Sequence, residues 1–326
     1  AKAYLVGKPH RGLHYVSKIM SDTCIRVSSC AAALASQGYL YSLNYARQCS
    51  LQQFSKESCS LSRKEKRIES ADIRRMLLTQ KSYSEGALAL CLYATSLKED
   101  EKTADTECER QRAAVLLDLL TPVVKSWPSK YGGVVNDLAI QILGREGYCR
   151  DNPVEQLYRD QRINPIYEGT EGLHALDLLI NKIPLQNQYG FDIFKQEIRI
   201  TLQRLNSAVE LNDLFAPVND ALDRLDQVTS RLLHGIEKDP DRGLANAALY
   251  LDMFGRVTMS WIWLRQALAA RRALHDDKQL LDQSEKDFYQ GKLQAARFYI
   301  ERELPQTIQQ AALLSDNNQL CFDMQD

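Results

Sequence analysis

The chain is a succession of long segments in which apolar residues recur at helical spacing. In the first segment they form one stripe from Leu13 to Gly38, and the pattern extends to about Arg47. Residues 4–7 alone have the character of a strand. The same helical spacing predicts further helices over about 70–97, 108–125, 133–143, 153–162 and 171–181.

The expected breaks between these helices are polar or contain Gly and Pro. The longest polar stretch covers 50–69, and a charged connection covers 98–109. Residues 127–128 (Trp-Pro) are expected to end a helix, because proline removes a backbone donor and clashes with the preceding turn. The segments 144–147 (Gly-Arg-Glu-Gly) and 163–165 (Ile-Asn-Pro) are expected to end the helices that precede them.

A polar linker at 184–190 is the predicted boundary between two domains, 1–184 and 185–326. The predicted fold class is all-α, a helical bundle followed by a second, smaller helical domain. In this second part the helical patterns lie near 191–215, 217–237, 242–274 and 283–314, and a polar tail begins at Ser315.

The composition narrows the class of protein. Only 15 glycines and 9 prolines occur in 326 residues, which argues against an all-β or loop-rich fold. No apolar run approaches the ~20 residues of a membrane helix, so no membrane span is expected. A net charge of −1 argues against a generally basic nucleic-acid binder. The eight cysteines include no C-x-x-C pair, so we expect no metal site and interpret them as reduced thiols of a cytoplasmic protein.

Candidate chemistry is concentrated in 141–172, where glycines surround charged residues at helix ends. Glu168 lies between Pro165 and Gly169, just before a predicted helix. A carboxylate on such a turn can remove a proton from a bound substrate, and the backbone N–H groups that follow it can donate to a cofactor or a carbonyl. From the spacing alone, a helix-capping glutamate in a tight loop is the favoured interpretation.

Several segments resemble the acyl-CoA dehydrogenase family. Residues 137–180, which include Asn-Pro-Ile-Tyr-Glu-Gly-Thr-Glu-Gly, are similar to its carboxy-terminal helical domain. Residues 4–7 (Tyr-Leu-Val-Gly), 71–79 (Ala-Asp-Ile-Arg-Arg-Met-Leu-Leu-Thr) and 153–160 (Pro-Val-Glu-Gln-Leu-Tyr-Arg-Asp) fit the same family. Residues 288–299 resemble the extra helical domain of its long subgroup, so the resemblance covers nearly the whole chain.

The resemblance implies a flavoprotein of fatty acid metabolism. Such an enzyme uses FAD to introduce an α,β double bond into an acyl-CoA thioester, its substrate. By position in the motif, Glu168 matches the base that removes the α-proton, and Gly169 matches a residue near the substrate. Flavin contacts are implied for the residues that follow in the motif, Thr170, Glu171 and Gly172.

The resemblance also implies an oligomer, a homodimer or a homotetramer. Gln141 and Gly144 match the segment that reaches the FAD of a neighbouring subunit. The family has an amino-terminal helical domain and a middle β-domain, and this chain matches the family only from the end of the β-domain onward. We therefore expect the first wall of the flavin and acyl pocket to come from another portion or from a separate chain.

Three positions depart from the family pattern. Cys24 and Cys49 stand where the family usually has arginine, and Arg145 stands where it has glycine. Loss of an arginine–phosphate pair removes a strong charge-assisted contact. These departures predict that the chain alone does not retain FAD. They leave two hypotheses open, an enzyme that needs its missing portion and a non-catalytic helical remnant or self-associating interaction module.

Overall fold

The computed structural model describes residues 1–326 except 50–65, 206–208, 276–279, 317–319, 321–323 and 325–326. The described residues contain helices and no strand, which confirms the all-α prediction. Three short helical turns are present, η1 (Arg67–Glu69), η2 (Leu178–Lys182) and η3 (Val209–Leu214). The longer elements are α1 (Gly12–Gln48), α2 (Ala71–Thr103), α3 (Glu107–Leu143), α4 (Arg145–Tyr148), α5 (Pro153–Gln161), α6 (Glu171–Asp177), α7 (Tyr189–Leu205), α8 (Phe215–Lys238), α9 (Pro240–Leu244), α10 (Ala247–Leu274), α11 (Gln283–Arg302) and α12 (Gln306–Ser315).

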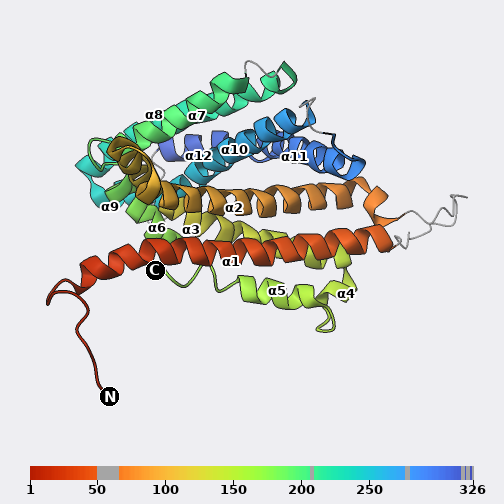
Figure 1. The fold of residues 1–326 in the computed structure, drawn as a ribbon, viewed down its shortest axis with the longest axis horizontal. Helices are drawn as coiled ribbons and strands as arrows, with labels where there is room; N and C mark the ends of the chain where they lie inside the picture. The colour runs from red at the N-terminus through yellow and green to blue at the C-terminus, as the bar shows by residue number, and fades with distance from the viewer. Residues whose placement is uncertain (50–65, 206–208, 276–279, 317–319, 321–323, 325–326) are drawn as a thin grey trace, which may run out of the picture.

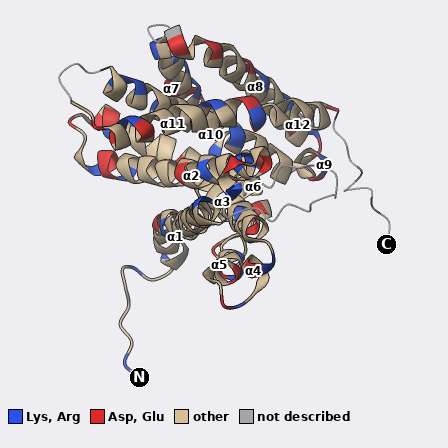
Figure 2. Ribbon diagram, turned by 90° about the vertical axis from the view of Figure 1, so that its right-hand side faces the viewer, with Lys and Arg blue, Asp and Glu red and all other residues tan. Residues whose placement is uncertain are grey.

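The long helices α1, α2 and α3 pack against one another along the length of the molecule (Figure 1). Helices α4 and α5 lie on one side of this group, against α1 and α3, and the helices from α7 to α12 lie on the other side (Figure 2). Helix α10 packs against α2, α3 and α6 as well as against α7, α8, α11 and α12. It therefore joins the two halves of the chain.

One hydrophobic core runs through both halves. Trp127 of α3 meets Tyr83 of α2 edge-on, with ring centroids 5.4 Å apart. Trp261 of α10 meets Tyr93 of α2 in the same way at 5.2 Å. Buried aromatic pairs of this kind add to the stabilisation from apolar burial. The predicted domain boundary at residue 184 stays a prediction, because the core is continuous on both sides of it.

Helix α3 is continuous, so the predicted break before Pro128 is wrong and the helices predicted over 108–125 and 133–143 are one. Pro128 has no N–H to donate to the carbonyl of Val124, four residues earlier. The hydroxyl of Ser28, on α1, donates to that carbonyl at 2.5 Å instead. A buried residue 96 positions away therefore supplies the missing hydrogen bond.

Other boundaries also differ from the prediction. The charged connection expected at 98–109 is mostly helical, because α2 runs to Thr103 and α3 begins at Glu107. The Thr106 hydroxyl accepts from the Glu109 N–H at 3.2 Å, and the Glu109 carboxylate accepts from the Thr106 N–H at 3.1 Å. This reciprocal cap fixes the start of α3.

In the second half, three of the predicted helices are shorter or divided. The helix expected over 191–215 is α7, which ends at Leu205, and those expected over 242–274 and 283–314 are each split in two. Residues 4–7 form no strand. Most of the polar stretch at 50–69 lies outside the described residues. None of the described helices is long and apolar enough to cross a membrane.

A buried polar network connects α3 to α10 and to the end of α11. Arg256 donates from Nε to Asp252 at 3.0 Å, from Nη1 to the Glu303 carboxylate at 3.1 Å and from Nη2 to the Tyr131 hydroxyl at 2.6 Å. Lys130 donates to Asp252 at 2.9 Å. Burial alone would raise the pKa of Asp252, but Arg256 and Lys130 hold it below its usual value. Each charge in this network therefore has a partner of opposite sign.

Candidate active site

Residues 162–170 form a tight loop between α5 and α6, where Pro165 and Gly169 predicted one. Glu168 and Gly169 have successive left-handed backbone conformations, with φ of 57° and 98°. Glycine adopts such angles freely, whereas a glutamate pays about 1–2 kcal/mol for them. A Cβ at position 169 would lie 2.7 Å from Nε2 of His174. The loop therefore holds Glu168 in a strained conformation that surrounding contacts must stabilise.

Lys125 of α3 is the first of these contacts. Its side chain is buried, and Nζ donates to the carbonyl of Asn164 at 2.7 Å and to that of Gly169 at 3.0 Å. The ammonium also lies 5.8 Å from the centre of the Tyr167 ring. Burial lowers the pKa of Lys125. No described carboxylate forms an ion pair with this lysine, so neutral carbonyl groups are its hydrogen-bond partners.

His174 of α6 is the second contact. Its Nε2 lies 3.2 Å from the backbone carbonyl of Glu168, so Nε2 carries the proton that is donated. Burial lowers the pKa of His174, and the positive charge of Lys125 lowers it further. The ring is therefore neutral at pH 7. The carbonyls of two successive loop residues are thus held by side chains from two different helices.

Glu168 is half-buried. Within the described residues, its carboxylate accepts no hydrogen bond and forms no ion pair. Its backbone is fixed while its side chain remains available. This combination suits a proton acceptor.

The residues after Glu168 begin α6 where predicted, with Thr170 as the N-cap. The Thr170 side chain makes no capping hydrogen bond, so the first N–H groups of α6, including those of Glu171 and Gly172, have no side-chain cap. The Glu171 carboxylate accepts from Lys130 at 2.8 Å, and Gly172 is exposed. The backbone of this turn can therefore donate to an electron-rich ring, whereas the Glu171 side chain is already paired.

Gln141 and Gly144 are exposed at the carboxy-terminal end of α3. Gly144 has φ of 67° and ψ of −134°, a conformation open essentially to glycine alone. Residue 141 lies about 24 Å along the helix axis from residue 125, at 1.5 Å per residue. The structure therefore separates the predicted site residues into two groups, one at the Glu168 loop and one at the end of α3.

Arg67 is a further cation at this end of α3, where it is not simply part of a solvated loop. Its Nη1 donates to the carbonyl of Ile142 at 3.0 Å, and its guanidinium lies 5.3 Å from the centre of the Tyr45 ring. Its backbone N–H donates to the carbonyl of Cys49 at 2.9 Å. An arginine from a distant part of the sequence thus lies beside the cysteine that stands at an expected arginine position.

The other two departures from the expected pattern differ in their surroundings. Cys24 is buried, and burial raises the pKa of its thiol while Lys125 opposes that shift. Arg145 is exposed at the start of α4. Cys24 is therefore a core residue near the loop, and Arg145 is a surface residue near Gly144.

One cavity lies directly beside the loop. It has a volume of about 370 Å³ and lies between α3 and α5, with Pro165 and Glu171 in its wall. A second cavity, of about 620 Å³, lies between α2 and α11 and is lined by Arg74 and Arg302, among others. Glu168 lines neither of these nor the third cavity described next. The half-buried Glu168 is thus not part of any of these three cavities.

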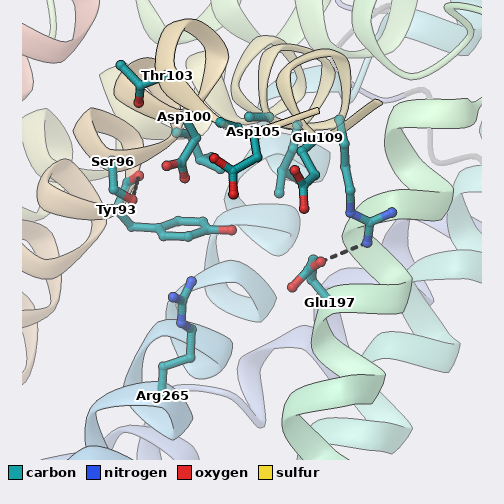
Figure 3. Close-up of a pocket in the computed structure, with 13 residues that line it drawn as sticks. Tyr93, Ser96, Asp100, Thr103, Asp105, Glu109, Glu197 and Arg265 are labelled. Atoms are coloured by element: carbon teal, nitrogen blue, oxygen red, sulfur yellow. Dashed lines mark hydrogen bonds and ion pairs between the residues drawn. The ribbon is translucent and has the colours of Figure 1, made fainter. Parts of the chain in front are cut away.

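The third cavity has a volume of about 570 Å³ and lies between α2, α3, α7 and α10. Figure 3 shows Asp100, Asp105 and Glu109 pointing into it from one side, with Arg265 opposite them. Glu197, also in its lining, is paired with an arginine at 2.7 Å. Carboxylates outnumber arginines here, so the cavity is poorly suited to a ligand rich in phosphate. No residue of the Glu168 loop lines it.

Sequence reasoning missed Lys125 because it placed the end of a helix there. A signal was present, since this lysine follows Val123 and Val124 and precedes Trp127 within an apolar run. A lone lysine on an apolar helix face requires a polar partner when it is buried. The sequence does not show that the partner is the Glu168 loop.

Two family models match the chain. The model described as "Acyl-CoA dehydrogenase, C-terminal domain" matches residues 10–179. The chain belongs to the acyl-CoA dehydrogenase family. A second model, "Acetyl-CoA dehydrogenase C-terminal like", matches residues 194–325. The resemblance of the chain to the carboxy-terminal helical part of this family is thereby confirmed.

Curated relatives carry the same family name. The broad-specificity linear acyl-CoA dehydrogenase FadE5 of Mycobacterium tuberculosis is 29% identical over 94% of this chain and 51% of its own length. The 3-methylmercaptopropionyl-CoA dehydrogenase of Ruegeria pomeroyi is 28% identical over 97% of this chain and 52% of its own length. The acyl-CoA dehydrogenase chain thus spans about half the length of these relatives.

Solved structures share the fold. Caenorhabditis elegans ACDH-11, solved in complex with C11-CoA, aligns with a TM-score of 0.71 at 20% identity over 92% of this chain and 46% of that one. An acyl-CoA dehydrogenase from Bacillus anthracis, complexed with FAD, aligns with a TM-score of 0.62 at 17% identity over 95% and 54%. At these identities the likeness establishes the helical fold.

Proposed function

We propose that this chain forms the carboxy-terminal half of an FAD-dependent acyl-CoA dehydrogenase and that Glu168 is its base. One observation carries the proposal: an uncommitted carboxylate lies on a loop whose carbonyls at 168 and 169 are both anchored. The loop has the sequence Tyr-Glu-Gly-Thr that the family resemblance assigns to the base. A positioned carboxylate can contribute roughly 10²–10⁴-fold to a proton transfer.

The proposed reaction removes two hydrogens from adjacent carbons of the acyl group. FAD, when bound, would accept the β-hydride. Glu168 takes the α-proton, whose acidity is increased by the thioester carbonyl. Gly169 has no side chain and lets the substrate approach the loop backbone. The N–H groups at the start of α6, after Thr170, have no side-chain cap and would be free to donate to a bound flavin.

Water must be excluded from the Glu168 carboxylate by a second wall, and this chain spans only about half the length of its relatives. We assign that wall to the half of the relatives that this chain does not span, supplied by the same protein or by a separate chain. Gln141 and Gly144, at the end of α3 and about 24 and 28 Å along the helix axis from Lys125, serve a neighbouring copy in a homodimer or homotetramer. Acyl-CoA is the substrate, and the cytoplasm is the expected location.

The chain alone is expected to hold FAD weakly or not at all. Cys49 supplies no cationic partner for the flavin phosphates, and Arg67 is already bonded to Ile142. Flavin titration of the isolated chain tests this expectation. We expect a colourless protein without saturable binding, and a yellow preparation with one flavin per chain would refute it.

The catalytic assignment is tested by co-expression with the amino-terminal and middle domains of a family member. We expect acyl-CoA to bleach the flavin of this assembly and expect the Glu168→Gln variant to lose bleaching while keeping its flavin. Glu69→Gln, at an exposed glutamate, is the matched control and keeps full activity. Full turnover by Glu168→Gln would end the assignment.

A second function is favoured by the exposed apolar side chains on the helices. Leu92 of α2 and Leu173 of α6 are each 61% exposed, and Leu88 and Ile180 are nearly half exposed. Such faces suit a non-catalytic module that self-associates. Sedimentation of the isolated chain tests this function, which requires a stable oligomer that never binds flavin, even with the missing domains present.

A further inference from the structure

Two cationic side chains are buried among the described residues, Lys125 and Arg256. Arg256 has two carboxylate partners, at 3.0 and 3.1 Å. Lys125 forms no ion pair with a carboxylate in the part of the chain that the structure describes, although the charge of Glu168 acts on it at longer range. A buried charge without a counterion weakens folding. The reason that a lysine occupies position 125 must therefore lie in the contacts that its ammonium makes.

The contacts of Lys125 are all with one loop. Its two hydrogen bonds reach the carbonyls of Asn164 and Gly169, which lie at either end of the short segment that contains Glu168. Its ammonium also faces the ring of Tyr167, the residue before Glu168. The Lys125 side chain of α3 thus contacts both ends of the loop that carries the Glu168 carboxylate.

These contacts stabilise the unusual backbone of the turn. Glu168 has a positive φ of 57°, which an unrestrained glutamate rarely adopts. The hydrogen bond from Lys125 to Gly169 fixes the peptide that follows this residue, and His174 fixes the carbonyl of Glu168 itself. Without the lysine, the Glu168–Gly169 turn would relax to a commoner conformation and its carboxylate would point elsewhere.

We propose that Lys125 is a positioning residue that holds the 164–169 loop and thereby aims the Glu168 carboxylate at the substrate. This inference rests on the proposed function, because aiming matters only if Glu168 is the base. Lys125 touches neither substrate nor cofactor in this scheme. Its effect reaches the reaction through the backbone of the loop, where a displacement of about 1 Å is enough to slow a proton transfer about 100-fold.

Amide hydrogen exchange of the full chain tests the structural part. In Lys125→Met, which keeps the length of the side chain but removes its N–H donors, we expect exchange at 164–171 to rise about tenfold while the rest of α3 keeps its protection. In Lys125→Arg, which retains the charge and the N–H donors, we expect exchange at 164–171 to rise less. Lys102→Met, at an exposed lysine, is the control. Unchanged exchange at 164–171, or an equal rise throughout the protein, would overturn the proposal.

Activity of the assembled enzyme tests the catalytic part. In Lys125→Met we expect kcat to fall about 100-fold with KM and flavin content unchanged, and in Lys125→Arg we expect partial recovery of kcat. A rise in KM with unchanged kcat would overturn the positioning role. If Lys125→Met does not fold, Lys125→Gln, which keeps a shorter donor, takes its place. If the exchange result holds while Glu168→Gln remains fully active, the proposed function fails and the anchoring of the loop stands.

Discussion

Helix α3 carries two cationic centres a little more than one turn apart. The balanced centre, at Lys130, has carboxylate partners, whereas the unbalanced centre, at Lys125, is hydrogen-bonded to neutral groups. Lys130 belongs to the Arg256 network, in which carboxylates of Asp252, Glu303 and Glu171 balance the positive charges. Lys125 faces carbonyl groups and an aromatic ring. The balanced centre joins secondary structure elements that are far apart in sequence. The unbalanced centre holds the strained loop that carries Glu168, whereas the Glu171 side chain that follows this loop is paired within the balanced centre.

The largest expected loss of stability follows a change in the balanced centre. Arg256→Met leaves Asp252 and Glu303 buried with less compensation, and we expect the free energy of unfolding to fall by about 3–5 kcal/mol. Urea denaturation measures this loss. The exposed Arg272→Met serves as the control and should change stability by less than about 0.5 kcal/mol. A similarly small loss for Arg256→Met would show that the network does not stabilise the fold.

A smaller loss is expected at the unbalanced centre. Lys125→Met leaves two carbonyl groups without their donors, for which we expect about 1–3 kcal/mol. The loss is smaller than for Arg256 because the abandoned partners are neutral and because the buried charge is itself removed. The same urea denaturation compares the two variants directly. Equal losses would contradict the distinction between the two centres.

Gly169 and Gly144, whose backbones have a positive φ, extend the comparison to the two ends of the candidate site. Gly169→Ala is expected to cost about 2 kcal/mol, because its Cβ meets His174 in addition to the backbone strain. Gly144→Ala is expected to cost about 1 kcal/mol, because no atom outside its chain neighbours lies within 4 Å of its Cβ and the strain alone remains. Thermal unfolding of both variants gives the two values, and the reverse order would refute the role assigned to His174.

The smallest expected effect concerns pH. Burial lowers the pKa of His174, so the folded state binds its proton less readily than the unfolded state does. Stability is therefore full above the ordinary histidine value of 6.5 and is lost as pH falls through the lowered pKa. His174→Gln keeps a donor for the Glu168 carbonyl but does not titrate, and we expect it to flatten the slope of stability between pH 7 and 5 by less than about 1 kcal/mol. Guanidinium denaturation at several pH values measures that slope, and an unchanged slope would contradict the prediction.

Much of the fold could be predicted from local patterns. The start of α6 after Thr170, the Pro153 start of α5 and the ends of α1 and α2 within several residues follow from periodicity and turn chemistry. The continuity of α3 through Pro122 and Pro128 could not be predicted, and the carbonyl that Pro128 leaves without a donor accepts from Ser28 of another helix. Local rules for proline contain no information about a hydroxyl on another helix.

The same limit applies to the candidate site. The motif placed Glu168 and Gly169 in a loop before a helix, and the structure has that loop. Lys125 is 39 residues from Asn164 and 44 from Gly169 along the chain, so no spacing rule connects them. Arg67 reaches the end of α3 in the same way, across 75 residues. Sequence patterns reveal which groups can react, whereas tertiary packing decides which groups hold them.

The unbroken course of α3 through its prolines has a mechanical consequence. Lys125, which anchors the Glu168 loop, and the glycine turn at residue 144 both lie on this one helix, and no break separates them. The spacing between the two is therefore set by the rise of a helix and not by the length of a loop. In the proposed assembly of two copies, this helix would determine how far each Glu168 loop lies from the surface that meets the other copy.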